Sequence, residues 1–131
     1  MQSNKRFMIR NGAVVLPDRI LPAGKYAVWV DGDHIEAIQG DDDRSNFAAD
    51  AVIDARGGWI LPGFVDVHCH GGGGFDFMDG TAEAFQQILA IHARHGTTAI
   101  APTAVACSLA ELGHLSGSVG RFSRLITKVL I

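Results

Sequence analysis

The chain has 131 residues and a formal net charge of −3, and 47% of its residues are hydrophobic against 19% charged. This length fits one ordinary domain, and the composition is typical of a folded globular protein rather than a disordered one. The small negative charge, with scattered Lys and Arg, disfavours a DNA or RNA partner.

The N-terminal stretch MQSNKRFMIRNG lacks the apolar core and small-residue cleavage site of a secretory signal. No apolar run approaches the ~18 residues of a membrane-spanning helix. We therefore expect a cytoplasmic protein with no membrane partner. Cys69 and Cys107 are too few and too far apart for a disulfide framework or a CxxC metal site, so we expect two reduced, buried thiols.

Short β-like runs fill the first part of the chain, in the order FMIRNGAVVLP, YAVWV and HIEAI. Asp31-Gly32 lies between two of them and favours a tight hairpin, because glycine tolerates the positive φ of such turns. Residues 1–60 are therefore predicted to form a small antiparallel β unit. Within this range, the acidic run GDDDRSNFAAD that follows HIEAI predicts a solvated loop, which we favour over a metal site at Asp41, Asp42 and Asp43.

A different pattern begins with WILPGFVDVHCH, a continuous apolar run typical of a strand buried on both faces of a parallel sheet. Next, apolar positions at helical spacing predict an amphipathic helix over residues 81–96, with Thr81 as its N-cap and Gly96 near its end. TTAIAPT then predicts a second strand. Strand, helix and strand indicate an α/β fold over residues 61–131, either a parallel barrel or a doubly wound sheet.

A second helix is predicted to start at Ser108, which has capping-box spacing to Glu111. Gly113, Gly117 and Gly120 follow within eight residues, and each costs about 1 kcal/mol relative to alanine in a helix interior. We therefore expect an irregular segment before a helical pattern resumes in RFSRLITKVLI.

The candidate functional residues are His68 and His70, one residue apart at the end of the apolar run. Alternation along a strand puts Phe64, Asp66, His68 and His70 on one face, and Val65, Val67 and Cys69 on the other. At the C-terminal end of a parallel strand, where active sites of barrels lie, two neutral imidazoles can bind one divalent cation. We favour this metal site over a pair of hydrogen-bonded core histidines.

The four glycines after His70, Gly71 to Gly74, allow two interpretations. One is a flexible connection from strand to helix. The other is a loop whose backbone N–H groups hold the phosphate of a substrate. The remaining histidines, His34, His92, His95 and His114, have no partner at ligand spacing, and we expect surface or hydrogen-bonded core positions for them.

These stretches resemble the amidohydrolase superfamily. VIDARGGWILPGFVDVHCHG is similar to its passage from an N-terminal β-sandwich into the first barrel strand, and HGGGGFDFMDGT and HGTTAIAPT resemble the N-acetylglucosamine-6-phosphate deacetylase family. The resemblance covers about Ile53 to Thr103, with a looser match before it. It implies part of a small β-sandwich over residues 1–60, followed over residues 61–131 by the start of a TIM-like (β/α)8 barrel. That barrel is truncated here, because a complete one needs ~250 residues.

The resemblance also implies an activity: metal-dependent deacetylation of N-acetylglucosamine 6-phosphate to glucosamine 6-phosphate and acetate, in amino-sugar metabolism. His68 and His70 correspond to metal ligands, the cofactor is a divalent ion, often zinc, and the complete protein is expected to be a homo-oligomer. The family's later ligands and its catalytic Asp lie beyond the end of this chain, so we expect the chain alone to be inactive. Two alternatives are an amidohydrolase that opens cyclic amides, and a non-catalytic chain that binds metal or a partner.

Overall fold

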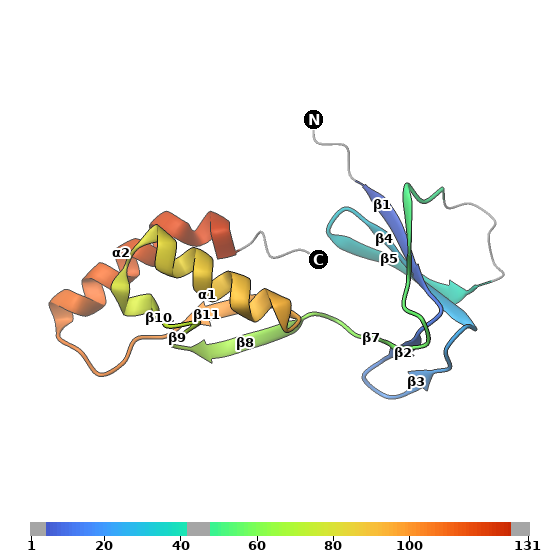
Figure 1. Ribbon diagram of the computed structural model, residues 1–131, viewed down its shortest axis with the longest axis horizontal. Coiled ribbons are helices and arrows are strands. Elements are labelled where there is room, and N and C mark those ends of the chain that lie inside the picture. The colour runs from blue at the N-terminus through green and yellow to red at the C-terminus, as the bar shows by residue number, and fades with distance from the viewer. Residues whose placement is uncertain (1–4, 42–47, 127–131) are drawn as a thin grey trace. The chain divides into compact units, whose positions relative to one another are not determined.

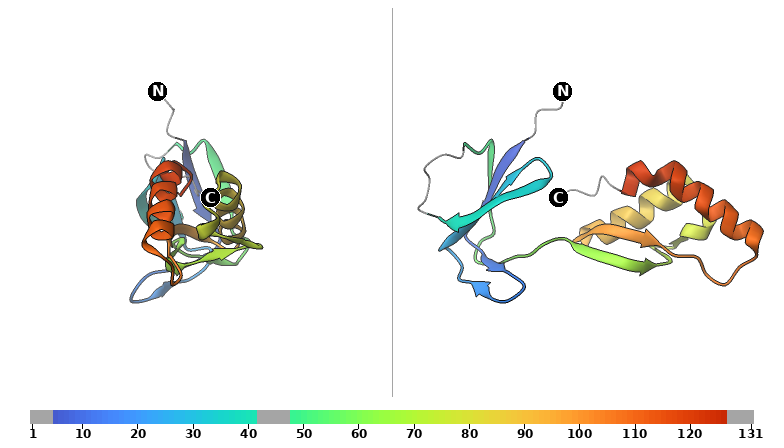
Figure 2. Two further views of the ribbon diagram at one scale, coloured as in Figure 1. Left: turned by 90° about the vertical axis from the view of Figure 1, so that its left-hand side faces the viewer. Right: turned by 180° about the vertical axis from the view of Figure 1, so that it is seen from behind.

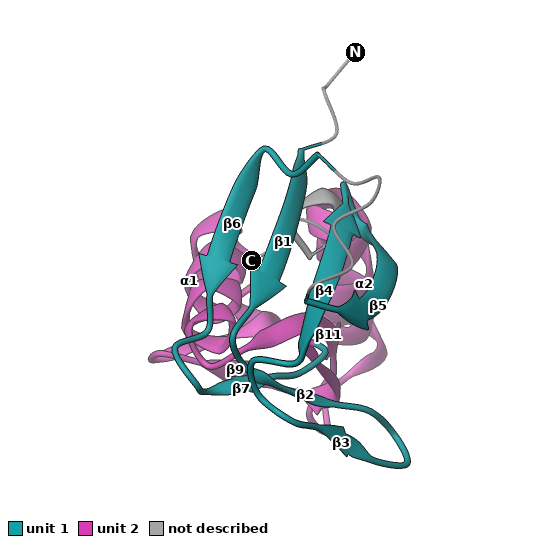
Figure 3. Ribbon diagram, turned by 90° about the vertical axis from the view of Figure 1, so that its right-hand side faces the viewer, with its two compact units in different colours: residues 1–62 teal, residues 63–131 magenta. Residues whose placement is uncertain are grey.

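The computed structural model describes residues 5–41 and 48–126. The chain divides into two compact units, Met1–Pro62 and Gly63–Ile131, which are described separately below (Figures 1 and 3). The predicted α/β class is confirmed, because the strands and helices occur in the predicted order. In the described part of the chain, no helix is long and apolar enough to cross a membrane.

The first unit consists of strands, arranged in one four-stranded and one three-stranded sheet. The larger sheet has the order β5-β4-β1-β6, formed by His34–Gly40, Tyr26–Asp31, Arg6–Arg10 and Ala51–Asp54. The smaller has the order β3-β2-β7, formed by Ile20–Leu21, Ala13–Val15 and Trp59–Ile60. The predicted hairpin at Asp31-Gly32 is confirmed, with Asp31 paired to His34 and Gly32 at φ 62°.

The prediction of a purely antiparallel unit was wrong. β1 pairs antiparallel with β4 but parallel with β6, and β2 pairs parallel with β7. Two parallel neighbouring strands need a long connection between them. For β1 and β6, that connection contains the hairpin of β4 and β5. The small core of this unit contains Ala27, Val28 and Trp29 of β4, all buried.

The second unit packs two helices against a pair of parallel strands. Its elements are β8 (Phe64–Cys69), β9 (Gly71–Gly72), β10 (Phe75–Asp76), the 3-10 helix η1 (Phe77–Asp79), α1 (Ala82–Arg94), β11 (Thr97–Pro102) and α2 (Leu109–Ile126). β8 and β11 are parallel neighbours, as predicted. Both helices lie on the same side of this strand pair, as Figures 1 and 2 show.

Helix α1 follows the prediction closely. The Thr81 hydroxyl accepts a hydrogen bond from the Ala84 N–H at 3.2 Å, so it caps the helix start. Phe85, Ile88 and Leu89 form the buried face, together with Phe77 of η1 and Leu115 of α2. Gly96, at φ 88°, lies just past the end of the helix.

β8 is less buried than its apolar sequence predicted. Phe64, Val65 and Val67 are 57%, 67% and 75% exposed, although Cys69 at its end is buried. The reason is coverage: among the described residues, β8 pairs with β11 alone, and the helices cover one side of the pair. The prediction of a strand buried on both faces is therefore wrong for this structure.

Helix α2 is continuous, so the predicted break at its glycines was wrong. The capping box at its start is confirmed: the Ser108 N–H donates to a Glu111 carboxylate oxygen at 2.8 Å, and the Glu111 N–H donates to the Ser108 hydroxyl at 3.3 Å. The hydrogen bonds from Ser108 hold the pKa of Glu111 below its ordinary value. Leu115 and Ser118 are buried against the rest of the unit, and this packing outweighs the low helix propensity of glycine.

Replacing Gly113 and Gly117 by alanine is expected to stabilise the second unit by about 1 kcal/mol at each position. A Cβ added at either glycine meets no atom within 4 Å, so the change costs no contact. Urea unfolding followed by the helical circular dichroism signal tests this. A lower urea midpoint for either variant would contradict it.

Candidate functional site

The two predicted metal ligands lie together where β8 ends. The rings of His68 and His70 have centroids 5.0 Å apart and are nearly perpendicular, at 85°. His68 is exposed and His70 is half-buried. The strand therefore presents two imidazoles side by side at its C-terminal end, as the sequence predicted.

Thr103 orients the second of these rings. His70 Nδ1 lies 2.9 Å from the Thr103 carbonyl oxygen, just after the end of β11. Because a carbonyl oxygen only accepts hydrogen bonds, Nδ1 carries a proton, and in the neutral ring Nε2 then has the lone pair. A metal-binding histidine usually has this arrangement, with its second nitrogen donating to a carbonyl or carboxylate oxygen. Thr103 was not predicted from the sequence, although its position directly after the parallel neighbouring strand was a usable signal.

The four glycines form a tight hairpin rather than a flexible connection. β9 and β10 pair antiparallel, with Gly72 opposite Phe75 and Gly71 opposite Asp76. Gly73 and Gly74 form the turn, with φ angles of 64° and 88°. Residues other than glycine adopt such positive φ angles only at a cost in conformational energy. The run is therefore explained by backbone conformation, and the interpretation as a flexible loop is wrong.

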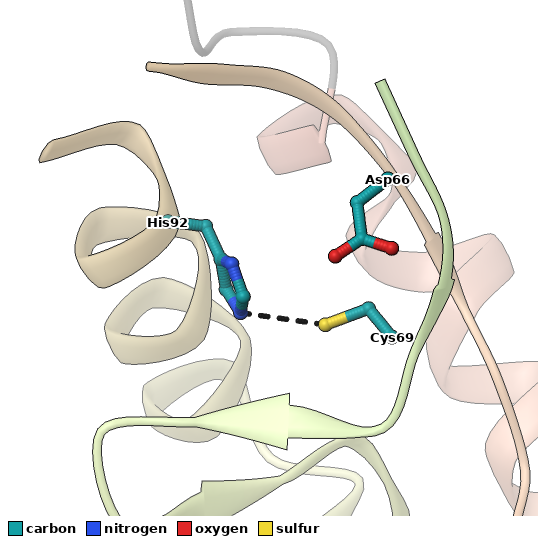
Figure 4. A group of neighbouring side chains, drawn as sticks. All are labelled: Asp66, Cys69 and His92. Carbon is teal, nitrogen blue, oxygen red and sulfur yellow. Dashed lines mark hydrogen bonds between the residues drawn. The ribbon is translucent and has the colours of Figure 1, made fainter. Parts of the chain in front are cut away.

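A second group of polar side chains was not predicted. Asp66, Cys69 and His92 each place a potential ligand atom within 4.8 Å of the other two (Figure 4). Cys69 is buried, and the other two are half-buried. Among residues 5–41 and 48–126, this is the one such group of three or more His, Cys, Asp or Glu residues, so His68 and His70 have no third ligand at that spacing there.

The group exists because the strand departs from strict alternation. Asp66 pairs with Ile100 and Cys69 with Pro102, so two residues of β8 lie opposite one residue of β11. An extra residue of this kind reverses which face the following side chains occupy. The prediction that Asp66 and Cys69 lie on opposite faces was therefore wrong.

Cys69 is a thiol rather than a thiolate in this setting. Burial raises its pKa above the ordinary value, and the negative charge of Asp66 raises it further. Its Sγ lies 3.4 Å from His92 Nε2 and 3.5 Å from the Gly71 carbonyl oxygen. Cys107 is exposed, so the prediction of two buried thiols holds for Cys69 alone.

The other histidines are single surface residues or packing residues. His34 is exposed beside Asp33, and His95 is exposed at the end of α1. The His114 ring lies against Gly80, where an added Cβ would be 2.3 Å from Nε2. His92 donates from Nε2 to the Gly71 carbonyl oxygen at 3.1 Å, as a hydrogen-bonded core histidine does. The prediction that it has no partner at ligand spacing was wrong.

The first unit contains an open cavity of ≈ 450 Å³ between its strands. Its lining includes Arg10 and Asp41, whose side chains form an ion pair at 2.5 Å, and Asp54. Hydrogen bonds from the Arg56 N–H and the Asn11 side chain hold the pKa of Asp54 below its ordinary value. Asp41 is thus engaged in an ion pair, whereas Asp42 and Asp43 lie outside the described residues.

No model of a known protein family matches the chain, and no curated protein matches it in sequence. Solved structures do match. An N-acetyl-D-glucosamine-6-phosphate deacetylase variant from Mycobacterium smegmatis, determined in complex with N-acetyl-D-glucosamine-6-phosphate, aligns over 98% of this chain and 31% of its own, at 23% identity and a TM-score of 0.74. The deacetylase from Pasteurella multocida aligns over 94% and 32%, at 22% identity and a TM-score of 0.82.

A molinate hydrolase matches less well, at 20% identity and a TM-score of 0.54 over 94% of this chain and 28% of its own. At these identities the likeness shows the fold alone, which this chain shares with part of each of these hydrolases. The chain spans about a third of the length of the two deacetylases.

Proposed function

We propose that this chain is the N-terminal part of an amidohydrolase of the N-acetylglucosamine-6-phosphate deacetylase type, and that His68 and His70 are two of its metal ligands. The complete hydrolase would cleave the acetyl amide of N-acetylglucosamine 6-phosphate, giving glucosamine 6-phosphate and acetate. The supporting observation is the adjacent pair of imidazoles, with centroids 5.0 Å apart, at the end of β8 in this fold.

The chemistry of the two donors fits a divalent cation. The Thr103 carbonyl oxygen accepts from His70 Nδ1, so Nε2 is the nitrogen that can bind an ion, and the exposed His68 ring is free to turn toward the same ion. When bound, such an ion, commonly zinc, lowers the pKa of a water ligand and polarises the substrate carbonyl. The contribution of this chain is to orient His70 through the Thr103 carbonyl and to hold both rings at one strand end.

We expect the 131-residue chain alone to release no acetate from N-acetylglucosamine 6-phosphate above the metal blank. A catalytic zinc site needs about three protein ligands and a positioned base, and the two histidines supply two ligands. The measurement is acetate and free-amine release with Zn²⁺, Co²⁺ or Mn²⁺ added. A full-length deacetylase serves as the positive control. Turnover that disappears with His68→Gln would contradict the prediction.

Zn²⁺ is expected to shift the side-chain NMR signals of His68 and His70 together. The physical reason is shared coordination: one cation bridging two adjacent imidazoles changes both rings at the same metal concentration. His68→Gln should weaken the response of His70, whereas His95→Gln, a change at an exposed histidine of the same unit, should leave it unchanged. Independent responses of the two rings would argue against a shared ion.

Two alternative functions lead to different observations. A cyclic-amide hydrolase differs from a deacetylase in the amide that it cleaves, so a substrate panel on a full-length version of the protein would separate these two functions. A non-catalytic chain that binds a partner is favoured by the exposure of Val65 and Val67 on β8. A defined oligomer in light scattering, without turnover, would support that second alternative.

The other expectations from the sequence remain proposals. They are a cytoplasmic location, a homo-oligomeric complete protein, and the lack of a nucleic-acid or membrane partner. A role for the glycine hairpin in holding the substrate phosphate is also a proposal, and its ordered turn at Gly73 and Gly74 is compatible with it.

A further inference from the structure

The group of Asp66, Cys69 and His92 lies between β8 and helix α1, separate from the proposed pair of His68 and His70 (Figure 4). Its three side chains are a thiol, an imidazole and a carboxylate. These are the protein ligands that zinc and similar cations use. We propose that Asp66, Cys69 and His92 form a second metal site, for a thiophilic divalent cation such as Zn²⁺.

The distance between the two nitrogen and sulfur donors is the first argument. Zinc binds sulfur at ~2.3 Å and imidazole nitrogen at ~2.0–2.1 Å, so two such donors on a tetrahedral ion lie about 3.5 Å apart. Cys69 Sγ and His92 Nε2 are 3.4 Å apart. Both atoms are therefore placed to share one ion without movement of β8 or α1.

Charge balance is the second argument. A Cys69 thiolate and the Asp66 carboxylate carry two negative charges, which a divalent cation neutralises, and the His92 imidazole binds as a neutral ligand. A neutral complex can occupy a half-buried position with little of the desolvation cost that an unpaired charge would meet.

Two local adjustments complete the site. Asp66 Oδ1 accepts a hydrogen bond from the His68 N–H at 3.1 Å, so its other oxygen can turn toward the ion while that bond is kept. His92 must move its proton from Nε2 to Nδ1, because Nε2 now donates to the Gly71 carbonyl oxygen. That carbonyl oxygen, 3.1 Å from Nε2, or a water molecule takes the fourth position.

A rival interpretation is a cysteine nucleophile activated by the histidine. Such a nucleophile needs a lowered pKa and access to solvent. Cys69 is only 5% exposed, so a substrate cannot reach its sulfur from solvent. The other rival is a hydrogen-bonded core cluster that binds no ion, and the experiment below distinguishes it from a metal site.

The test is a Co²⁺ titration of the full 131-residue chain carrying Cys107→Ser, which leaves Cys69 as the single thiol. We expect thiolate-to-Co²⁺ charge-transfer absorption in the near ultraviolet that saturates at one equivalent, and protection of Cys69 from a thiol reagent. Added Zn²⁺ should remove the absorption by displacing Co²⁺. Absence of the absorption at a large excess of Co²⁺ would overturn the proposal.

Variants then identify the ligands. His92→Gln is expected to lower the Co²⁺ affinity by more than the ~10–100-fold that loss of an outer-shell partner costs, and Asp66→Asn to lower it measurably. His95→Gln, at an exposed histidine that directly follows the same helix, should have no effect. An unchanged affinity in His92→Gln, with helical circular dichroism retained, would refute the assignment.

The double variant His68→Gln/His70→Gln separates this site from the proposed catalytic pair. It is expected to keep the full charge-transfer absorption, because neither residue belongs to the group of three. Loss of the absorption in this variant would place the thiolate-bound ion at the histidine pair and overturn the second site. The result is independent of whether the proposed deacetylase function is correct.

Discussion

Replacing Phe85 by alanine is expected to lower the free energy of unfolding of the second unit by about 3–5 kcal/mol. Phe85 is fully buried, and its ring centroid lies 4.9 Å from that of Phe77 and 5.1 Å from that of Phe122. One truncation therefore removes two aromatic contacts and leaves a cavity where η1, α1 and α2 meet. A small unit of marginal stability would lose its helical structure without denaturant.

The two units provide separate signals for this measurement. All described helices lie in the second unit, so helical circular dichroism reports on it, whereas Trp29 and Trp59 lie in the first unit and their fluorescence reports on that one. Phe64→Ala is the matched control, because this phenylalanine is 57% exposed and should cost about 1 kcal/mol or less. If Phe85→Ala and Phe64→Ala lowered the free energy of unfolding equally, Phe85 would not be a core residue.

Replacing Gly71 by alanine is expected to destabilise the second unit by about 3 kcal/mol or more. An added Cβ would lie 2.2 Å from the Phe75 carbonyl oxygen and 2.9 Å from the Asp76 Cα. Both are backbone atoms of the opposite strand, so β9 and β10 must separate. The Gly71 carbonyl would then move away from His92, and the proposed Cys69 site should bind Co²⁺ more weakly.

Gly74→Ala is the control for that prediction. Nothing lies within 4 Å of a Cβ added at Gly74, but its φ of 88° is unfavourable for alanine, so a cost of only about 1–2 kcal/mol is expected. The two variants can be compared by urea unfolding and by their Co²⁺ spectra. If Gly71→Ala lowered the free energy of unfolding no more than Gly74→Ala does, that result would contradict the close contact between β9 and β10.

Local signals in the sequence were sufficient for much of the fold. The spacing of Phe85, Ile88 and Leu89 predicted the buried face of α1, because residues three and four apart share one side of a helix. Thr81, Ser108 and the Asp31-Gly32 turn act through neighbouring backbone atoms, and each does so as predicted. The parallel pairing of β8 with β11 followed from the strand, helix, strand order.

The wrong predictions concern features that depend on packing between distant segments. Helix α2 continues through three glycines because Leu115 and Phe122 pack against the core formed by η1 and α1. Helix propensity does not include this stabilisation of α2, because the stabilisation comes from contacts with residues about thirty positions earlier in the chain. The exposure of Val65 and Val67 likewise depends on which elements cover β8, and no local pattern specifies that.

The candidate sites divide in the same way. The adjacency of His68 and His70 was predicted from sequence alone, because alternate residues at a strand end can lie side by side without a further partner. Thr103 and the group of Asp66, Cys69 and His92 required the tertiary structure. Their side chains meet through the pairing of β8 with β11, an irregular register within it, and the packing of α1 on the strands.

The sequence by itself thus determined the α/β class, the ends of α1 and the adjacent histidines, because caps, turns and periodicity act within a few residues. The tertiary structure decided the continuity of α2, the orientation of the His70 ring and the proximity of the side chains in the group of Asp66, Cys69 and His92. Each of those depends on contacts between segments distant in the chain, whose geometry follows from packing and strand register rather than from any local pattern.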